Sequence, residues 1–291
     1  MIDLHQRREA CESYLSRSLG VPVTLVDANK LTQSTREAPW KLDVIAVGVA
    51  RSYVLQLDER GLEYEYRVLK AMEVIGAPSP RAYGLDLRGE ALGVPCFFSD
   101  FIAGESLLRP MLDGEPWAEA VYIDAIGALH SVTRSDLGDL DVDQESAEEV
   151  LEAAWCYFND NPQPLAEVMY RRLKESQPDL PPVRFSNGDL WLDNFIVQGQ
   201  QLAGVIDFQR AGFGDPIFEF LLAFFVEPKL QGRGIEERFC RRLGYDPAIL
   251  HWYHGLEFFD TWRAVLQHDE PFVHHTADSL EADIKAWLGP V

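Results

Sequence analysis

Three polar residues follow one another at fixed spacings in the second half of the sequence. Asp189 lies in a Gly-Asp pair, Asn194 comes five residues later, and Asp207 ends the next apolar run. A carboxylate can receive the proton of an attacking hydroxyl, and carboxylate and amide oxygens suit Mg²⁺ that bridges nucleotide phosphates. This set of side chains therefore has the composition that phosphoryl transfer from a nucleotide requires.

The spacing of the three residues carries more information than any one of them. A Gly-Asp turn alone is common in proteins and has no catalytic meaning. Here Asp189 and Asn194 have the spacing Asp-x-x-x-x-Asn, and Asp207-Phe208 stands where protein kinases have Asp-Phe-Gly. Gly214-Asp215-Pro216 follows shortly afterwards. The joint pattern favours a phosphoryl-transfer site over a set of unrelated turns.

The size and charge of the chain restrict the other classes of function. The 291 residues, 47% of them hydrophobic, are enough for a sizeable core and about two domains. A formal net charge of −21 disfavours nucleic acid and anionic membranes as partners. The same charge either forms a solvated acidic surface, which we favour, or attracts a cationic ligand. We expect a monomer or a homodimer.

Cysteines and apolar runs indicate the compartment. The four cysteines are scattered without a Cys-x-x-Cys pair, so the sequence signals neither a zinc site nor a disulfide framework. The N-terminal stretch lacks a long apolar segment, and no later run reaches about 18 uncharged apolar residues. We therefore expect a soluble cytoplasmic protein.

The first hundred residues have the pattern of a small sheet with helices. Four apolar or β-branched runs separated by turns predict strands over residues 21–26, 42–49, 53–57 and 94–102. Apolar residues at helical spacing predict helices over residues 2–19 and 61–75. Residues 103–105 interrupt the last run, and the composition becomes helical beyond them.

The remainder of the chain is predicted to be mostly helical. Apolar periodicity predicts helices over residues 117–132, 151–173 with a break at 159–162, 217–226, 235–243, 247–267 and 276–288. Two short buried strands are expected around the three polar residues, with Asp189, Asn194 and Asp207 at their ends. The predicted domains are residues 1–103 and residues 104–291.

The order of these motifs resembles that of the aminoglycoside phosphotransferase/choline kinase family over nearly the whole chain. That family usually shows His-Gly-Asp-x-x-x-x-Asn, then Ile-Asp-Phe or Ile-Asp-Trp, then Gly-Asp-Pro. This sequence has Asn187-Gly188-Asp189 with Asn194, then Ile206-Asp207-Phe208, then Gly214-Asp215-Pro216. The resemblance implies an α+β, protein-kinase-like bilobal fold. Its N-terminal lobe would carry a small antiparallel sheet and bind the nucleotide, and its larger, mainly helical C-terminal lobe would carry catalysis and substrate binding.

The resemblance also implies roles for the individual polar residues. Asp189 would be the catalytic base, and Asn194 and Asp207 would bind Mg²⁺ beside ATP. Asp215 would brace the loop that follows the metal-binding Asp. Asn187 stands where the family usually has a scaffold His, and because Asn can also bond to backbone groups, we expect activity to survive this difference.

The nucleotide side of the site departs further from the family. The backbone of the hinge, from Ser99 to Phe101, would bond to adenine. Gln56 stands where the family has its phosphate-binding Lys, so the ion pair with the helix Glu, here Glu65, cannot form. The loop expected to cover the phosphates has no glycine and offers only hydroxyls and one positive charge, from Thr32, Ser34, Thr35 and Arg36.

Two interpretations of this departure are open. In the first, Arg36 supplies the positive charge that Gln56 lacks, and the protein is an active kinase. In the second, the protein is a pseudokinase that binds nucleotide or ligand without efficient transfer. Retention of all three polar residues favours the active enzyme. A protein kinase is disfavoured, because few residues separate Asp207 from Gly214 and leave no room for a long activation loop.

The acceptor is expected to be a hydroxyl of a small molecule: an aminoglycoside-like antibiotic, a choline-like amine or a sugar metabolite. Trp191 and Asp193 lie within the catalytic loop and are the nearest candidates for contact with it. Glu257 and Asp260 lie in an aromatic-rich helix and would suit a cationic acceptor by charge and cation–π attraction. The alternative for that helix is ordinary packing of its aromatic residues.

Overall fold

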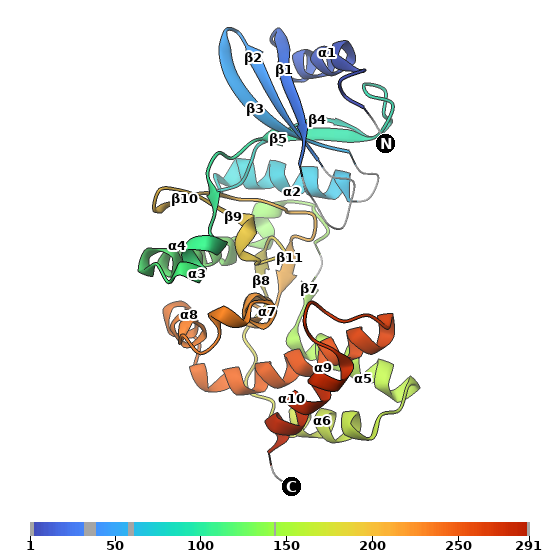
Figure 1. Cartoon of the computed structure of the whole chain (residues 1–291), viewed down its shortest axis with the longest axis vertical. Helices are drawn as coiled ribbons and strands as arrows, with labels where there is room; N and C mark the ends of the chain where they lie inside the picture. The colour runs from blue at the N-terminus through green and yellow to red at the C-terminus, as the bar shows by residue number, and fades with distance from the viewer. Residues whose placement is uncertain (1–2, 32–38, 58–60, 143, 290–291) are drawn as a thin grey trace. The chain divides into compact units, whose positions relative to one another are not determined.

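The computed structural model describes residues 3–31, 39–57, 61–142 and 144–289. It divides into two compact units, which are described separately (Figure 1). Unit 1 contains residues 1–106, 133–141 and 195–211, and unit 2 contains residues 107–132, 142–194 and 212–291. The domain boundary predicted after residue 103 stays a prediction.

Unit 1 is built on a five-stranded antiparallel sheet with the order β1-β2-β3-β5-β4. Its strands are β1 (Val23–Lys30), β2 (Trp40–Ala46), β3 (Val49–Gln56), β4 (Ala82–Asp86) and β5 (Cys96–Asp100). Consecutive side chains of a strand point to opposite faces. Phe98 therefore packs on Tyr14 of the first helix, whereas Phe97 meets Tyr66 of the second helix on the other face.

The two helices of unit 1 cover opposite faces of this sheet. Helix α1 (Arg8–Leu19) buries Tyr14 and Leu15 in the main core of the unit and ends at Gly20, whose φ of 70° suits glycine. Helix α2 (Leu62–Ile75) connects β3 to β4 and buries Glu65 near its start. The unit also holds a smaller sheet of β6 (Glu105–Ser106), β9 (Phe195–Gln198) and β10 (Gln201–Val205), and the short helix η1 (Arg134–Leu137).

Unit 2 is mainly helical. Its α-helices are α3 (Leu108–Asp113), α4 (Pro116–His130), α5 (Ala147–Asp160), α6 (Pro164–Glu175), α7 (Phe218–Val226), α8 (Ile235–Leu243), α9 (Leu250–His268) and α10 (Ala277–Leu288). Short helices η3 (Pro228–Leu230) and η4 (Pro247–Ile249) lie between α7, α8 and α9, and η2 (Leu192–Asn194) lies just before β9. A small sheet has the order β7-β11-β8, from β7 (Gln144–Glu145), β8 (Arg184–Ser186) and β11 (Gly212–Gly214).

Aromatic side chains form much of the core of unit 2. Phe220 of α7 stacks on Phe239 of α8 with 3.6 Å between ring centroids and lies 5.7 Å from the ring of Tyr122 in α4. Phe158 of α5 contacts Trp262 of α9 at 4.7 Å. Aromatic contacts contribute about 0.5–1.5 kcal/mol each beyond the burial of their surface. The contacts of Phe220 hold α7, which follows the Gly-Asp-Pro motif, against α8 and α4.

The antiparallel N-terminal sheet and the helical C-terminal region confirm the fold class predicted from the sequence. The first helix begins at Arg8 rather than at residue 2, and the interrupted stretch at 151–173 forms two separate helices. One expectation was wrong: Asn194 does not end a strand but closes η2 and directly precedes β9. Helix α3 and the strands β7 and β11 were not predicted, because their segments are too short to show periodicity.

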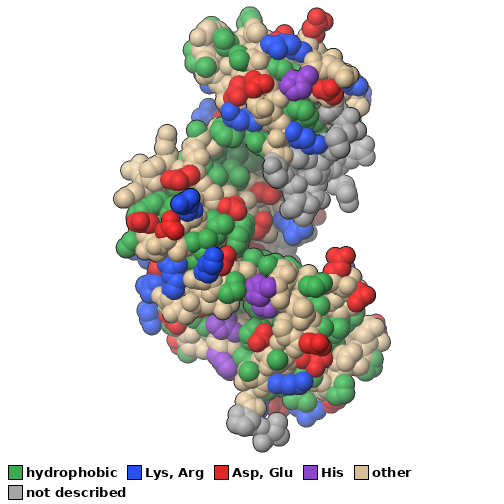
Figure 2. Space-filling view, in the orientation of Figure 1, with side chains coloured by type: hydrophobic (Ala, Val, Ile, Leu, Met, Phe, Trp, Pro, Cys, Tyr) green, Lys and Arg blue, Asp and Glu red, His purple; other side chains and the backbone are tan. Residues whose placement is uncertain are grey.

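Charged side chains are distributed over the surface. Asp and Glu side chains are dispersed over the face that Figure 2 shows, with Lys and Arg among them. Surface ion pairs connect several of these groups, such as Arg238 with Glu119 and Arg242 with Asp124. No helix formed by the described residues is both long enough and apolar enough to cross a membrane.

Candidate active site

The loop around Asp189 is held by hydrogen bonds to its own backbone. The Nδ2 atoms of Asn187 and Asn194 both donate to the carbonyl oxygen of Asp189, at 2.9 and 3.0 Å. The carboxylate Oδ1 of Asp189 accepts from the backbone N–H of Trp191 at 3.3 Å, and Tyr122 Oη donates to the carbonyl of Leu190 at 2.5 Å. These bonds fix the position of the Asp189 backbone before any ligand arrives.

The expectation that Asn187 bonds to the backbone in place of the usual His is confirmed by its bond to Asp189. Asn187 is fully buried, so this contact is protected from water. In Asn194, the bond from Nδ2 to the Asp189 carbonyl leaves the amide oxygen Oδ1 as the group that can bind a cation. This donor chemistry fits the predicted role of Asn194 as a Mg²⁺ ligand.

A second set of contacts, made by Ser186 and Glu219, holds the start of this loop. Ser186 Oγ donates to the carboxyl of Glu219 and accepts from the N–H of Gly188 at 2.8 Å. Glu219 lies against Gly214: a Cβ at that glycine would lie 1.7 Å from Glu219 Oε1. Burial raises the pKa of Glu219 to about 7. Sequence reasoning missed Glu219, although a Glu four residues after Asp215, within an apolar helix, was a usable signal.

Asp215 is held by buried hydrogen bonds within unit 2, and its predicted role of bracing the loop after Asp207 stays a prediction. It is 2% exposed, and its Oδ1 accepts from the N–H groups of Ile217 and Phe218, both at 3.0 Å, at the start of α7. Its Oδ2 accepts from Tyr253 Oη at 2.8 Å. Burial raises the pKa of Asp215, and these hydrogen bonds oppose that shift. The residue therefore ties α7 to α9.

Asp207 lies in unit 1, two residues after the end of β10. Its φ of 60° places a non-glycine residue in the left-handed region, which is uncommon and is concentrated at functional sites. Nearby contacts fix this segment: Val205 N donates to Pro78 O at 2.7 Å, and Tyr64 Oη of α2 donates to Ala211 O. The backbone at Asp207 is therefore held in place by neighbours on both sides.

The residues expected to hold the phosphates are described only in part. Gln56 ends β3 opposite Phe97 of β5, and Glu65 is buried in the first turn of α2, 4% exposed. Both belong to unit 1, as does Asp207. The loop residues expected to cover the phosphates lie outside the described residues: Thr32, Ser34, Thr35 and Arg36.

The hinge residues already have backbone partners within unit 1. Ser99 pairs with Val54 in the sheet, and the N–H of Phe101 donates to Ser52 O at 3.1 Å. An adenine that bonded to the N–H of Phe101 would therefore have to replace this bond. The ring of Phe101 lies under Lys41 Nζ, 5.0 Å from its centroid.

The four candidate acceptor residues all lie in unit 2, in two groups. In the loop after Asp189, Trp191 Nε1 donates to Asp193 Oδ2 at 3.1 Å, so these two side chains form one pair. On α9, Glu257 is 4% exposed, whereas Asp260 forms an ion pair with Arg263 at 2.8 Å. Among the described residues, no group of three His, Cys, Asp or Glu side chains is close enough to hold a metal ion.

Comparison with known proteins identifies the family. The model of the phosphotransferase enzyme family, APH, matches residues 37–269. A putative aminoglycoside phosphotransferase from Ralstonia eutropha JMP134 has a TM-score of 0.66 and 16% identity, covering 96% of this chain and 95% of its own. No curated protein sequence matches this chain closely enough to count as a relative.

Two further solved structures share the fold. A thermostable mutant of aminoglycoside phosphotransferase APH(4)-Ia, in a ternary complex with AMP-PNP and hygromycin B, has a TM-score of 0.64 and 17% identity, covering 96% of this chain and 97% of its own. A choline/ethanolamine kinase family protein from Mesorhizobium loti has a TM-score of 0.60 and 17% identity, covering 91% of this chain and 88% of its own. Since the family model spans most of the sequence, this chain belongs to the phosphotransferase enzyme family.

Proposed function

We propose that this protein is an ATP- and Mg²⁺-dependent kinase that transfers the γ-phosphoryl group to a hydroxyl of a small molecule. The observation that carries this proposal is the loop in which the amides of Asn187 and Asn194 hold the backbone of Asp189. Membership of the phosphotransferase family and structural neighbours that bind AMP-PNP or ADP support it.

In the proposed reaction, the acceptor oxygen forms a bond to the γ-phosphorus while the bond between that phosphorus and the β–γ bridging oxygen breaks. Asp189 receives the acceptor proton, and ADP leaves. Oδ1 of Asn194 and the carboxylate of Asp207 would bind Mg²⁺, which when bound supplies positive charge to the phosphate oxygens. Phosphoryl transfer needs the protein mainly to position the reacting groups. The hydrogen bonds that fix the Asp189 backbone would hold its carboxylate ready to receive the acceptor proton.

Gln56 carries no positive charge for the nucleotide phosphates, but Lys41 in the neighbouring strand β2 could supply one. Residues paired across antiparallel strands share a face, so Lys41, which pairs with Val54, lies on the same face as Gln56, two residues further along. Lys41 Nζ is bound to Asp43 at 2.8 Å, and this bond lowers the pKa of Asp43. We propose that Lys41, together with Arg36, supplies charge to the nucleotide.

The alternative proposal is a pseudokinase, favoured by one observation, the uncharged Gln56 at the end of β3. A coupled assay of ADP release over aminoglycosides, choline-like amines and sugars separates the two. The kinase proposal predicts release above the ATPase background with at least one acceptor and its loss in Asp189→Asn. Release that persists in Asp189→Asn does not come from this site, and ATP binding without any release supports the pseudokinase.

A further inference from the structure

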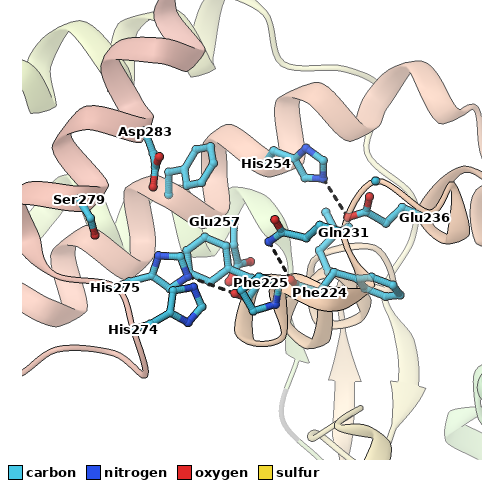
Figure 3. A pocket seen from close by; sticks show the side chains of 14 residues that line it. Phe224, Phe225, Gln231, Glu236, His254, Glu257, His274, His275, Ser279 and Asp283 are labelled. Atoms are coloured by element: carbon cyan, nitrogen blue, oxygen red, sulfur yellow. Dashed lines mark hydrogen bonds and ion pairs between the residues drawn. The ribbon is translucent and has the colours of Figure 1, made fainter. Parts of the chain in front are cut away.

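A cavity of about 600 Å³ lies among the C-terminal helices of unit 2. Its walls come from α7, α8, α9 and α10 and from the segments that connect α7 to α8 and α9 to α10 (Figure 3). Phe224, Phe225 and Phe258 give it aromatic walls. Cavities of this size and lining are typical of small-molecule sites. Every lining residue belongs to unit 2, so the cavity is defined within one compact body.

Glu257 brings a carboxyl group to this cavity. Figure 3 shows it at the centre of the labelled side chains, between His275 and His254. The residue is 4% exposed, and its Oε2 has no hydrogen-bond partner among the described residues. A buried polar atom without a partner is unfavourable, so a ligand that donates a hydrogen bond here removes that penalty.

The charges around the cavity favour a cation. Besides Glu257, the acidic side chains of Glu236 and Asp283 line it, and the described residues that line it include no Lys or Arg. Two of the lining histidines have partners already. His254 Nε2 lies 3.2 Å from Glu236 Oε1, and His275 Nε2 lies 3.1 Å from the carbonyl of Phe225.

We propose that this cavity binds a hydrophobic monoamine, with its single protonated amine paired with Glu257 and its apolar body packed on Phe224, Phe225 and Phe258. Aromatic faces add cation–π attraction for such an amine. A polyhydroxylated amino sugar fits less well, since those of its hydroxyls that pack against Phe224, Phe225 and Phe258 would lose water without gaining a partner there. The site rests on unit 2 alone and does not depend on the proposed phosphoryl transfer.

Amine binding should release a proton from Glu257. Burial, with a contribution from the charge of Asp260, raises the pKa of Glu257 well above its ordinary value, which favours the neutral carboxyl. Pairing with an ammonium group requires the ionised carboxylate, and the proton goes to solvent. Affinity should therefore rise with pH until the amine itself loses its charge.

Other groups that titrate near the cavity must be separated from Glu257. The charged or titratable side chains near Glu257 are Asp260 on the same helix and five that line the cavity: Glu236, His254, His274, His275 and Asp283. Burial lowers the pKa of the His275 imidazole, and loss of its charge as the pH rises also favours a cation. Only a variant of Glu257 itself distinguishes the two contributions.

The test is isothermal titration calorimetry of the full chain with three probes of similar shape: 2-phenylethylamine, 2-phenylethanol and 3-phenylpropanoate. The proposal predicts that the amine binds at least tenfold more tightly than the alcohol and the acid. Titrations in buffers of different ionisation enthalpy should show a net release of protons when the amine binds. The proposal is overturned by no saturable binding of the amine at millimolar concentration, or by equal binding of the alcohol.

Matched variants identify the group responsible. Glu257→Gln keeps the side-chain volume, and we expect at least a tenfold loss of amine affinity, unchanged alcohol binding and no proton release. Glu281→Gln on α10, which removes an exposed ion pair with Lys285, should bind the amine like wild type. Asp189→Asn should also bind it normally, so failure of phosphoryl transfer and failure of this site give different results. Equal amine affinity in Glu257→Gln and wild type contradicts the proposal.

Discussion

Replacing Gly214 with Ala should strongly lower the free energy of unfolding, because Glu219, which bonds to Ser186, packs directly against this glycine. An added Cβ would lie 1.7 Å from Oε1 and 2.7 Å from Cδ of Glu219, a side chain held in the interior by its bond to Ser186. Glu219 must move, which breaks that bond and strains the packing. A lost buried hydrogen bond costs about 1–3 kcal/mol, and overpacking costs about 1–3 kcal/mol more. We therefore expect a loss of about 2–6 kcal/mol in the free energy of unfolding.

Urea unfolding followed by tryptophan fluorescence measures this loss, because Trp40 alone of the seven tryptophans lies outside unit 2. Gly127→Ala is the matched control: this glycine lies within α4, and its Cβ would lie 3.3 Å from the flexible tip of Leu243. Its unfolding free energy should change by less than about 1 kcal/mol.

A double-mutant cycle tests the cause. If the clash with Glu219 is responsible, Gly214→Ala should cost little in a Glu219→Ala background, where the obstructing carboxyl is absent. The reasoning is refuted if Gly214→Ala is as stable as wild type, or if its cost is the same in both backgrounds.

Three further predictions concern the charges and the loop. Lys41→Met should weaken ATP binding at least fivefold by calorimetry, whereas Lys70→Met on α2, which removes a surface pair with Glu73, should not; equal affinities would exclude Lys41. The folded-state pKa of Glu219 is raised to about 7 from 4.5, so its contribution to stability is complete below about pH 4.5 and is lost as the pH rises. Glu219→Gln should therefore remove up to about 3 kcal/mol of the decline in unfolding free energy between pH 5 and pH 7.5, and an unchanged pH profile in chemical denaturation would contradict this. Asn187→Ala should lower the unfolding free energy by about 1–2 kcal/mol and slow ADP release, whereas Asn187→His should retain activity; equal rates in all three proteins would show that the bond to Asp189 has no role.

The fold class and the positions of most elements could be predicted because they depend on local patterns. Apolar periodicity locates α2 and α9, and the spacing of Asp189, Asn194 and Asp207 locates the catalytic segment. The bond from Asn187 to the backbone was also predictable, because an amide can replace an imidazole as a donor.

Features that depend on distant contacts could not be predicted. Lys41 shares a face with Gln56 only through the register of β2 and β3, which sequence spacing does not specify. Glu219 became recognisable only when its contacts with Ser186 and Gly214 were seen. Glu257 was selected for its charge, but the cavity beside it is formed by segments that lie far apart in the sequence.

The most direct test of the proposed phosphotransferase site is the effect of Mg²⁺ on ATP binding. Wild-type protein is titrated with ATP in the presence of Mg²⁺ and in the presence of EDTA, and Asp207→Asn is titrated in the same way. We predict that Mg²⁺ tightens ATP binding at least tenfold in wild type and has little effect in Asp207→Asn. Equal affinities of wild type with and without Mg²⁺, or an undiminished Mg²⁺ effect in Asp207→Asn, would contradict the account.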